Sequence, residues 1–416
     1  MTSIVRYANN LLEVYWNNYI MKKKVVLVLL DACRGDYISA GNTPFLVNAV
    51  EKGRYYKSLI PSYGFCERTE ILVGLDAKES GCFTAFGYNP RKSPYRNFRY
   101  IFRFLGLVET SIKSVFLSKV LRRLIWEIFR FKKDAFYPAR IPLRDVPDFA
   151  LTEDGVLNHI EGHGQSVYQK CKNPYLGATT SLSSYISGTD QDRLDSVLNA
   201  IDQDYDFYPT YMSVLDSVGH VYGPESEQMK EALSAADAQL QSFYEKLSLS
   251  KDSPTLVICG DHGMSPVLHK ADIEKVVHEF KKEENLSDEI SIFLDSTMAR
   301  FWCDLEITQI ENLKKAITAL YGNLGYFVEK ENYALEGIPC SRMYGDLIWL
   351  CREGVVISPD YFTPADKNIL GMHGYRPNDT QHYGFCIISD NEIDSQKMHE
   401  PAPLTAVYQE LIQYFP

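Results

Sequence analysis

The run VVLVLL at residues 25–30 is apolar throughout and ends at Asp31. A short β-rich run of this kind, bounded by polar residues, is typical of a strand that is buried on both faces of a sheet. Because helical stretches separate it from similar runs, we expect an α/β fold with a largely parallel central sheet. The similar runs are TYMSVL at 210–215, which ends at Asp216, TLVICG at 255–260, which ends at Asp261 and His262, and YGFCIIS at 383–389.

Three stretches between these runs carry helix signals. The segment 43–52 has Pro44 early and Gly53 just past its end, which are typical start and stop signals. The segments 229–247 and 307–321 have the apolar spacing of amphipathic helices. The last of them lies in a region of different character that we expect to form a small lobe.

The composition narrows the class of protein. The 416 residues carry a net charge of −11, which argues against a dedicated nucleic-acid binder, since such proteins usually have a basic excess. Nine scattered cysteines without a CxxC pair argue against a disulfide framework and favour a reducing cytoplasm. Residues 1–21 contain no apolar signal-peptide core, and no run is long enough to cross a bilayer, so we expect a cytoplasmic protein.

One segment stands apart by charge. Residues 91–140 contain thirteen Lys and Arg but three acidic residues, within apolar stretches such as FRYIFRFLGLV and VFLSKVLRRLIWEIFRF. The interpretation we favour is a helical insertion whose apolar face packs on the sheet while its basic face is solvated. A basic amphipathic helix is also typical of peripheral contact with anionic lipid, and an anionic substrate or partner is a third interpretation.

Two motifs at strand ends have the chemistry of metal ligands. Asp216 and His220, in DSVGH, place a carboxylate and an imidazole about one turn apart. Asp261 and His262 are adjacent, and Gly263 permits the sharp turn that would let both reach one ion. Carboxylate and imidazole are both good zinc ligands, although each motif alone could also be a capping pair or a polar turn.

Two further residues complete the set. Asp31 ends a buried strand, where a carboxylate is costly unless it is paired or bound to metal, and His373 lies between glycines in GMHGY. Together three Asp and three His could form two sites for zinc, or for manganese as a second option. Two ions a few ångström apart can clamp a phosphoryl group.

The order of these motifs resembles the alkaline phosphatase superfamily, and most closely its type I phosphodiesterase/nucleotide pyrophosphatase family. The matching pieces are VVLVLLDACRGDY, NTPFLVNAVEKG, LVGLDAKESG, DSVGHVYGP, GDHGM and GMHGY. The resemblance implies a mostly parallel sheet flanked by helices. It places the catalytic core at 1–85, 205–290 and 350–416, a basic helical insertion at 86–204 and a small α+β lobe at 291–349. It also implies one metal held by Asp216, His220 and His373, and another by Asp31, Asp261, His262 and the nucleophile.

The nucleophile is where this sequence departs from the family. The family has Thr or Ser ten residues before the glycine that matches Gly74, and here that place is Gly64. If a helix begins at Glu67, Cys66 is its N-cap, where the helix dipole and a metal would lower the thiol pKa. We therefore favour Cys66 as nucleophile and metal ligand. Ser62, Thr69 and a metal-bound water are the alternatives.

Arg68 is the other catalytic candidate in this stretch. A guanidinium can pair with phosphate oxygens, although a surface ion pair with Glu67 or Glu70 is the alternative. Sulfatases of the superfamily start from a Cys at this helix, but their C-x-[PA]-x-R pattern is absent, because Arg68 comes only two residues after Cys66.

These residues predict an enzyme that hydrolyses phosphodiester or pyrophosphate bonds with two divalent metals. Its expected partner is a phosphate-ester substrate. The alternatives are a phosphotransferase or phosphodiesterase that acts on a lipid-linked or surface glycan, a sulfatase, and a metal-binding homologue that has lost catalysis. The natural substrate and the oligomeric state do not follow from the sequence.

Overall fold

The structure is a computed structural model and describes eight stretches of the chain. These are residues 24–111, 114–132, 134–152, 165–176, 188–286, 289–363, 368–389 and 400–415. The expectation about residues 1–21 and two members of the basic segment, Lys113 and Lys133, therefore lie outside the described residues. Among the described helices, none combines the length and the apolar character that crossing a bilayer requires.

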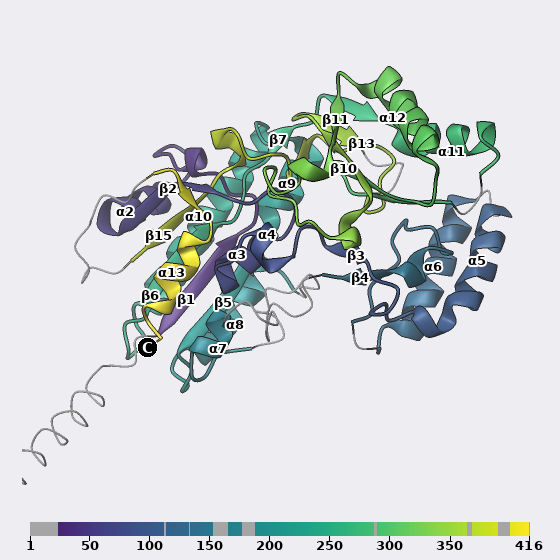
Figure 1. Cartoon of the computed structure of the whole chain (residues 1–416). Coiled ribbons are helices and arrows are strands. Elements are labelled where there is room, and N and C mark those ends of the chain that lie inside the picture. Colours follow the sequence, from purple (N-terminus) through teal and green to yellow (C-terminus); the bar gives the residue numbers. More distant parts are fainter. Residues whose placement is uncertain are drawn as a thin grey trace, which may run out of the picture.

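A six-stranded sheet forms the centre of the molecule and confirms the predicted α/β class (Figure 1). Strand β1 pairs in parallel with β5 and β6, and β15 runs antiparallel between β6 and β2. In spatial order the strands are β16 (Ala402–Pro403), β2 (Arg54–Ile60), β15 (Gly384–Ile388), β6 (Thr255–Gly260), β1 (Val25–Leu30) and β5 (Phe207–Met212).

Alternate residues of β1 point into two separate apolar cores, which explains why this strand is apolar throughout. Val25, Leu27 and Leu29 pack on one face of the sheet, and Val26 and Val28 on the other. The first face is covered by α3 (Glu67–Val73), α7 (Val167–Lys170) and α13 (Ala406–Ile412). The second face is covered by α2 (Pro44–Lys52), α8 (Asp190–Ala200) and α10 (Glu227–Leu247).

Strand β5 differs from its prediction in a way that matters for the site. We expected a strand at 210–215, but β5 ends at Met212 and helix α9 begins at Val214. The buried carboxylate of Asp190 accepts hydrogen bonds from the backbone N–H of Ser213 at 3.0 Å and of Val214 at 3.2 Å. This contact from a distant segment starts α9 (Val214–Tyr222), so Asp216 lies in a helix rather than at a strand end.

A second sheet of four antiparallel strands lies beside the first, in the order β11, β12, β10, β9. Its strands are β9 (Ile290–Leu294), β10 (Met298–Cys303), β11 (Gly325–Val328) and β12 (Leu347–Cys351), with the helices α11 (Ile273–Glu283) and α12 (Ile307–Tyr321) nearby. The division of the chain into a core, an insertion and a lobe stays a prediction. The remaining short elements are α4 (Ala77–Ser80), β3 (Phe86–Tyr88), β4 (Phe149–Leu151), β7 (Ser265–Pro266), β8 (His269–Ala271), β13 (Val355–Ile357) and β14 (Gly371–Met372).

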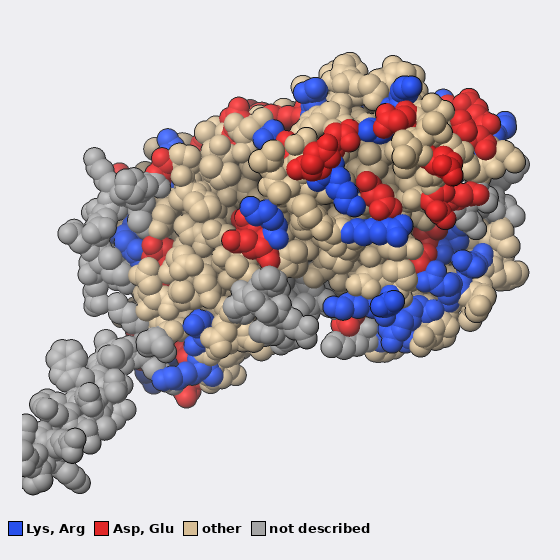
Figure 2. All heavy atoms as spheres, viewed as in Figure 1, with Lys and Arg blue, Asp and Glu red and all other residues tan. Residues whose placement is uncertain are grey.

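The basic segment forms two helices, α5 (Arg99–Ser111) and α6 (Val115–Phe129), at one end of the molecule (Figure 1). Lys and Arg side chains gather on the visible surface at this end (Figure 2). Phe102, Ile125 and Phe129 turn inward and join a core that they share with the second sheet. The apolar face of this insertion thus packs beside the second sheet rather than on the central sheet that we expected.

Candidate metal centre

The six predicted ligands meet at one edge of the central sheet. Asp31 follows β1, and Asp261 and His262 follow β6. Because β1, β5 and β6 are parallel, their carboxyl ends lie at the same edge, and α9 starts there after β5. His373 comes to the same place directly after β14.

The first group of possible ligands is Asp216, His220 and His373, whose ligand atoms all lie within 4.8 Å of one another. Asp216 Oδ1 is 3.1 Å from His220 Nε2 and 3.6 Å from His373 Nε2. Asp216 and His220 are four residues apart in α9, so the helix itself sets their spacing.

The second group is Asp31, Asp261 and His262, again with all ligand atoms within 4.8 Å. His262 Nε2 is 3.2 Å from Asp31 Oδ1 and 3.7 Å from Asp261 Oδ1. Asp261 Oδ1 also accepts hydrogen bonds from the backbone N–H of Ala32 and of His262. Asp261 and His262, although adjacent in the chain, thus both contribute to this group.

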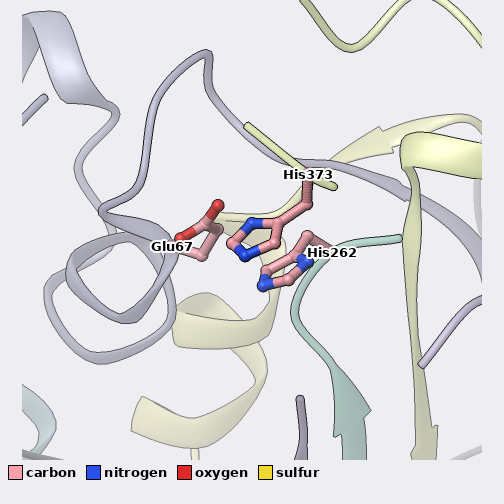
Figure 3. Close-up of side chains that lie close together, drawn as sticks. All are labelled: Glu67, His262 and His373. Carbon is pink, nitrogen blue, oxygen red and sulfur yellow. The ribbon is translucent and has the colours of Figure 1, made fainter. Parts of the chain in front are cut away.

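A third group joins the first two and contains a residue that the sequence analysis missed as a ligand. It consists of Glu67, His262 and His373, also with ligand atoms within 4.8 Å (Figure 3). The rings of His262 and His373 stack with centroids 3.9 Å apart, and Glu67 points toward them from the start of α3. The sequence offered only a weak signal, because an acidic side chain at a helix N-terminus is favoured in general, whether or not it faces a site.

Backbone contacts orient two of the three imidazoles. His220 Nδ1 lies 2.8 Å from the carbonyl of Gly371, and His262 Nδ1 lies 2.9 Å from the carbonyl of Gly263. A carbonyl can only accept, so each Nδ1 carries a proton, and each Nε2 faces the carboxylates of its own group. Imidazoles held in this way, with Nε2 turned toward the place where an ion would bind, are typical of metal sites.

The electrostatics of the cluster also fit bound cations. Burial, together with the charges of Asp216 and Asp261, raises the pKa of Asp31 to about 7. Burial and the neighbouring His262 hold the pKa of His373 well below its usual value, and its buried Nδ1 makes no hydrogen bond within the described residues. Buried carboxylates that repel one another are stable only with protons or cations between them, and this oxygen and nitrogen set suits zinc or manganese.

Cys66 and Gly64 occupy the stretch where the family has its nucleophile. Cys66 is the buried N-cap of α3, and it belongs to none of the three ligand groups found among the described residues. Gly64 has φ +114°, and a Cβ there would lie 2.1 Å from the carbonyl oxygen of Phe83. The backbone therefore excludes a Thr or Ser at 64, while the role of Cys66 stays a prediction.

The other candidates of this stretch lie around α3. The hydroxyl of Ser62 accepts a hydrogen bond from the backbone N–H of Ala77 at 3.3 Å, and Thr69 is fully buried. The guanidinium of Arg68 lies 4.8 Å from the ring centroid of Tyr211 in β5. Its predicted contact with phosphate stays a prediction.

A cavity of about 400 Å³ opens beside the first ligand group. His220 and His373 form part of its wall, so a molecule bound there would touch the cluster. The rest of the wall is mostly apolar with a few polar groups, which is typical of small-molecule sites. These residues include Phe65, Phe362, Ile369, Met372, Asp295 and Ser296.

Comparisons with known proteins show the family of this chain. Residues 135–376, more than half of the chain, match the family described as type I phosphodiesterase / nucleotide pyrophosphatase. The catalytic subunit of human GPI ethanolamine phosphate transferase 2 is 30% identical over 141 residues, which are 30% of this chain and 14% of that protein. Mouse ectonucleotide pyrophosphatase/phosphodiesterase family member 7 is 33% identical over 104 residues, 24% of each protein. The matches thus span less than a quarter of these curated relatives.

Solved structures match over almost the whole chain. Human ectonucleotide pyrophosphatase/phosphodiesterase 5 has a TM-score of 0.64 with 17% identity, over 94% of this chain and 95% of that one. An inactive variant of the murine protein, in complex with AMP, has a TM-score of 0.63 with 15% identity over the same shares. At this identity the likeness shows a shared fold.

Proposed function

The chain belongs to the type I phosphodiesterase/nucleotide pyrophosphatase family, and from this premise we propose that it hydrolyses phosphodiester or pyrophosphate bonds with two divalent metal ions. Family membership supports hydrolysis or transfer at a phosphodiester. The observation that carries the finer proposal is the pair of ligand groups at one sheet edge, joined by Glu67. The comparisons do not favour the alternative of a lipid-linked or glycan phosphotransferase.

We assign one ion to Asp216, His220 and His373, and the other to Asp31, Asp261 and His262. Zinc is the proposed metal, with manganese as the second option, because both accept mixed oxygen and nitrogen ligands. Two such ions, when bound, neutralise the phosphoryl oxygens and stabilise the attacking and leaving groups together.

Glu67 would take the ligand role that the resemblance gives to the family's nucleophile, and its carboxylate is close enough to one histidine of each set to contribute to both metal positions. Three features support this role. The Glu67 carboxylate lies close to one histidine from each set, the side chain is buried, and the residue is the first of α3. With a glycine at 64, the chain offers no hydroxyl at the family position. Water would then attack phosphorus directly: its oxygen forms the new P–O bond, the bond between phosphorus and the ester oxygen breaks, and one proton of the water ends on the leaving oxygen. No covalent protein intermediate forms.

The competing assignment keeps Cys66 as the nucleophile, and the stereochemistry at phosphorus separates the two. A single displacement by water inverts a chiral phosphorothioate diester, whereas attack by a thiol followed by hydrolysis retains its configuration through two inversions. Inversion is the expected result. Retention, together with loss of activity in Cys66→Ala, would restore Cys66 as the nucleophile.

The proposed function is tested by metal analysis combined with turnover of bis(p-nitrophenyl) phosphate. Wild type should bind two zinc or manganese ions and lose turnover in chelator, and Asp216→Asn should lose both metal and turnover. The matched control is His269→Asn, an exposed histidine of β8 outside the three groups. An inert wild type with two metals bound would instead indicate a homologue that has lost catalysis.

The cytoplasmic location remains part of the proposal. No disulfide joins any of the nine cysteines, all of which lie in the described residues, and this suits a reducing compartment. Cell fractionation with an antibody against the full chain tests it, and recovery from the medium would contradict it.

A further inference from the structure

Helices α5 and α6 expose a set of large apolar side chains to solvent. Eight of them are each more than half exposed: Tyr100, Ile101, Phe104, Leu107, Phe116, Leu117, Leu124 and Ile128. Exposed apolar side chains in this number on two helices are uncommon on a soluble protein and mark a site of interaction.

The spacing shows that α6 has two apolar faces with different environments. Leu117, Leu124 and Ile128 recur at helical intervals along the outer face. Ile125 and Phe129 lie on a neighbouring face of the helix and are buried in the shared core. Leu117, Leu124 and Ile128, the outer row, therefore do not contribute to the packing of the core.

A buried polar network fixes the two helices in this orientation. The Arg122 guanidinium of α6 pairs with the Glu109 carboxylate of α5, and it also donates to the carbonyl of Ile141 at 2.8 Å. The other Glu109 oxygen accepts from the backbone N–H of Leu143 at 3.0 Å. Turning the outer row inward would break these bonds and leave buried charges unpaired, which is strongly unfavourable.

Exposed basic side chains border the apolar rows. Lys119, Arg123 and Arg130 run along one side of α6, and Arg103 lies beside the apolar row of α5. Figure 2 shows Lys and Arg gathered at this end of the molecule, and the described part of the two helices contains two acids. Glu109 pairs with the buried Arg122, and Glu127 pairs with both Arg123 and Arg130, so the surface keeps a basic excess. An apolar row with a cationic border matches a membrane surface that carries negative charge.

We propose that the outer face of α5 and α6 docks the protein on an anionic lipid bilayer, an inference that does not rest on the proposed hydrolysis. The apolar rows enter the headgroup region while the bordering cations meet lipid phosphates. Charge favours this occupant over a second copy of the chain. A symmetric dimer through this face would place two basic surfaces opposite each other, and like charges across an interface are unfavourable.

The test is co-sedimentation of the full chain with vesicles. One set is pure phosphatidylcholine and the other contains about 30% phosphatidylserine, a composition that gives a negative surface potential. Binding to the anionic set alone, weakened by added salt, is the expected result. Absence of binding, or equal binding to both sets, would overturn the proposal.

Paired variants identify the surface. Phe104→Ser with Ile128→Ser should lower the affinity for anionic vesicles by about tenfold or more through lost apolar insertion. Arg103→Glu with Arg123→Glu should lower it by ~10-fold or more through lost charge attraction. The controls are Leu249→Ser with Leu320→Ser, two exposed leucines elsewhere, and the exposed Lys275→Glu. Unchanged thermal melting of each variant shows that it is folded.

Two results would contradict this assignment. Equal losses in the control variants would show that general surface character, rather than this face, governs binding. A dimer by light scattering that Phe104→Ser with Ile128→Ser dissociates would assign the face to a second copy of the chain.

Discussion

At the scale of single residues, Glu67 explains how two ligand sets can work as one site. Its carboxylate lies within 4.8 Å of ligand atoms of His262 and His373. These two histidines belong to different sets, and their rings stack with centroids 3.9 Å apart. A carboxylate between two cations at a helix N-terminus is stabilised both by the cations and by the helix dipole. The same carboxylate would be costly there without cations.

The first prediction compares Glu67 with its neighbour Cys66. Glu67→Gln removes the negative charge but keeps the size, so we expect kcat to fall by ~100-fold or more, with weaker metal binding. Cys66→Ala should stay within about threefold of wild type, because the thiol belongs to none of the ligand groups found in the described residues. Steady-state kinetics and metal analysis measure both effects.

Glu227→Gln, at an exposed position early in α10, is the matched control and should be silent. The opposite pattern, with loss of turnover in Cys66→Ala and full turnover in Glu67→Gln, would refute the assignment.

The second prediction concerns Gly64, where the structure leaves no room for a side chain. Gly64→Ala should destabilise the protein by about 3 kcal/mol, because the new Cβ meets the Phe83 carbonyl at 2.1 Å in a positive-φ conformation. Gly81→Ala is the matched control: φ is also positive, but its Cβ would meet open space. It should cost about 1 kcal/mol from backbone strain alone. Denaturant unfolding measures both, and equal losses would show that crowding at 64 is unimportant.

The sequence identified six members of the cluster because each stands in a recognisable local pattern. Asp31 and Asp261 end apolar runs, and Asp216 and His220 share one helical turn. Glu67 has no such pattern, since an acid at the first position of a helix is common on ordinary surfaces. Its place in the site depends on how α3 packs against two distant histidines, which local sequence does not encode.

At the scale of elements, the position of α9 decides whether the first ligand set forms. The helix begins where the Asp190 carboxylate accepts from the Ser213 and Val214 N–H groups. Asp190 comes from α8, so a packing contact between two segments sets the start of the ligand helix. This is also why the predicted strand 210–215 extends three residues beyond the real one.

The third prediction tests this link. Asp190→Ala should destabilise the protein by about 2 to 4 kcal/mol, because it leaves buried donors without their acceptor. It should also weaken zinc binding, since Asp216 and His220 are residues of α9 and shift with this helix. Asp192→Ala is the matched control on the same helix. The Asp192 carboxylate is exposed and accepts a hydrogen bond from the backbone N–H of Thr189, rather than from α9. That variant should change stability far less than Asp190→Ala and leave zinc affinity unchanged. Calorimetric zinc titration that shows equal affinity in both variants would contradict the link.

At the scale of the whole molecule, sequence patterns predicted the strands of the central sheet but not how the helices α5 and α6 pack. The runs at 25–30 and 255–260 are strands with those bounds, because burial on both faces leaves an unbroken apolar signature. The apolar pattern of α5 and α6 predicted helices that pack inward, yet a helix can carry apolar residues on two faces. Which face meets the core depends on the partner surface and on buried pairs such as Arg122 with Glu109.

The last prediction follows from where the ligands lie along the chain. They come from residues 31, 67, 216, 220, 261, 262 and 373, so bound metal ties together most of the segments that build the central sheet edge. A ligand that binds only the folded state stabilises it by about 4 kcal/mol when it exceeds its dissociation constant about a thousandfold. Chelation should therefore lower the melting temperature by about 5 °C or more, and zinc should restore it. The variant Asp216→Asn with Asp261→Asn should melt at one temperature with or without chelator. A chelator shift of equal size in that variant would mean that the metal stabilises the protein from somewhere other than this cluster.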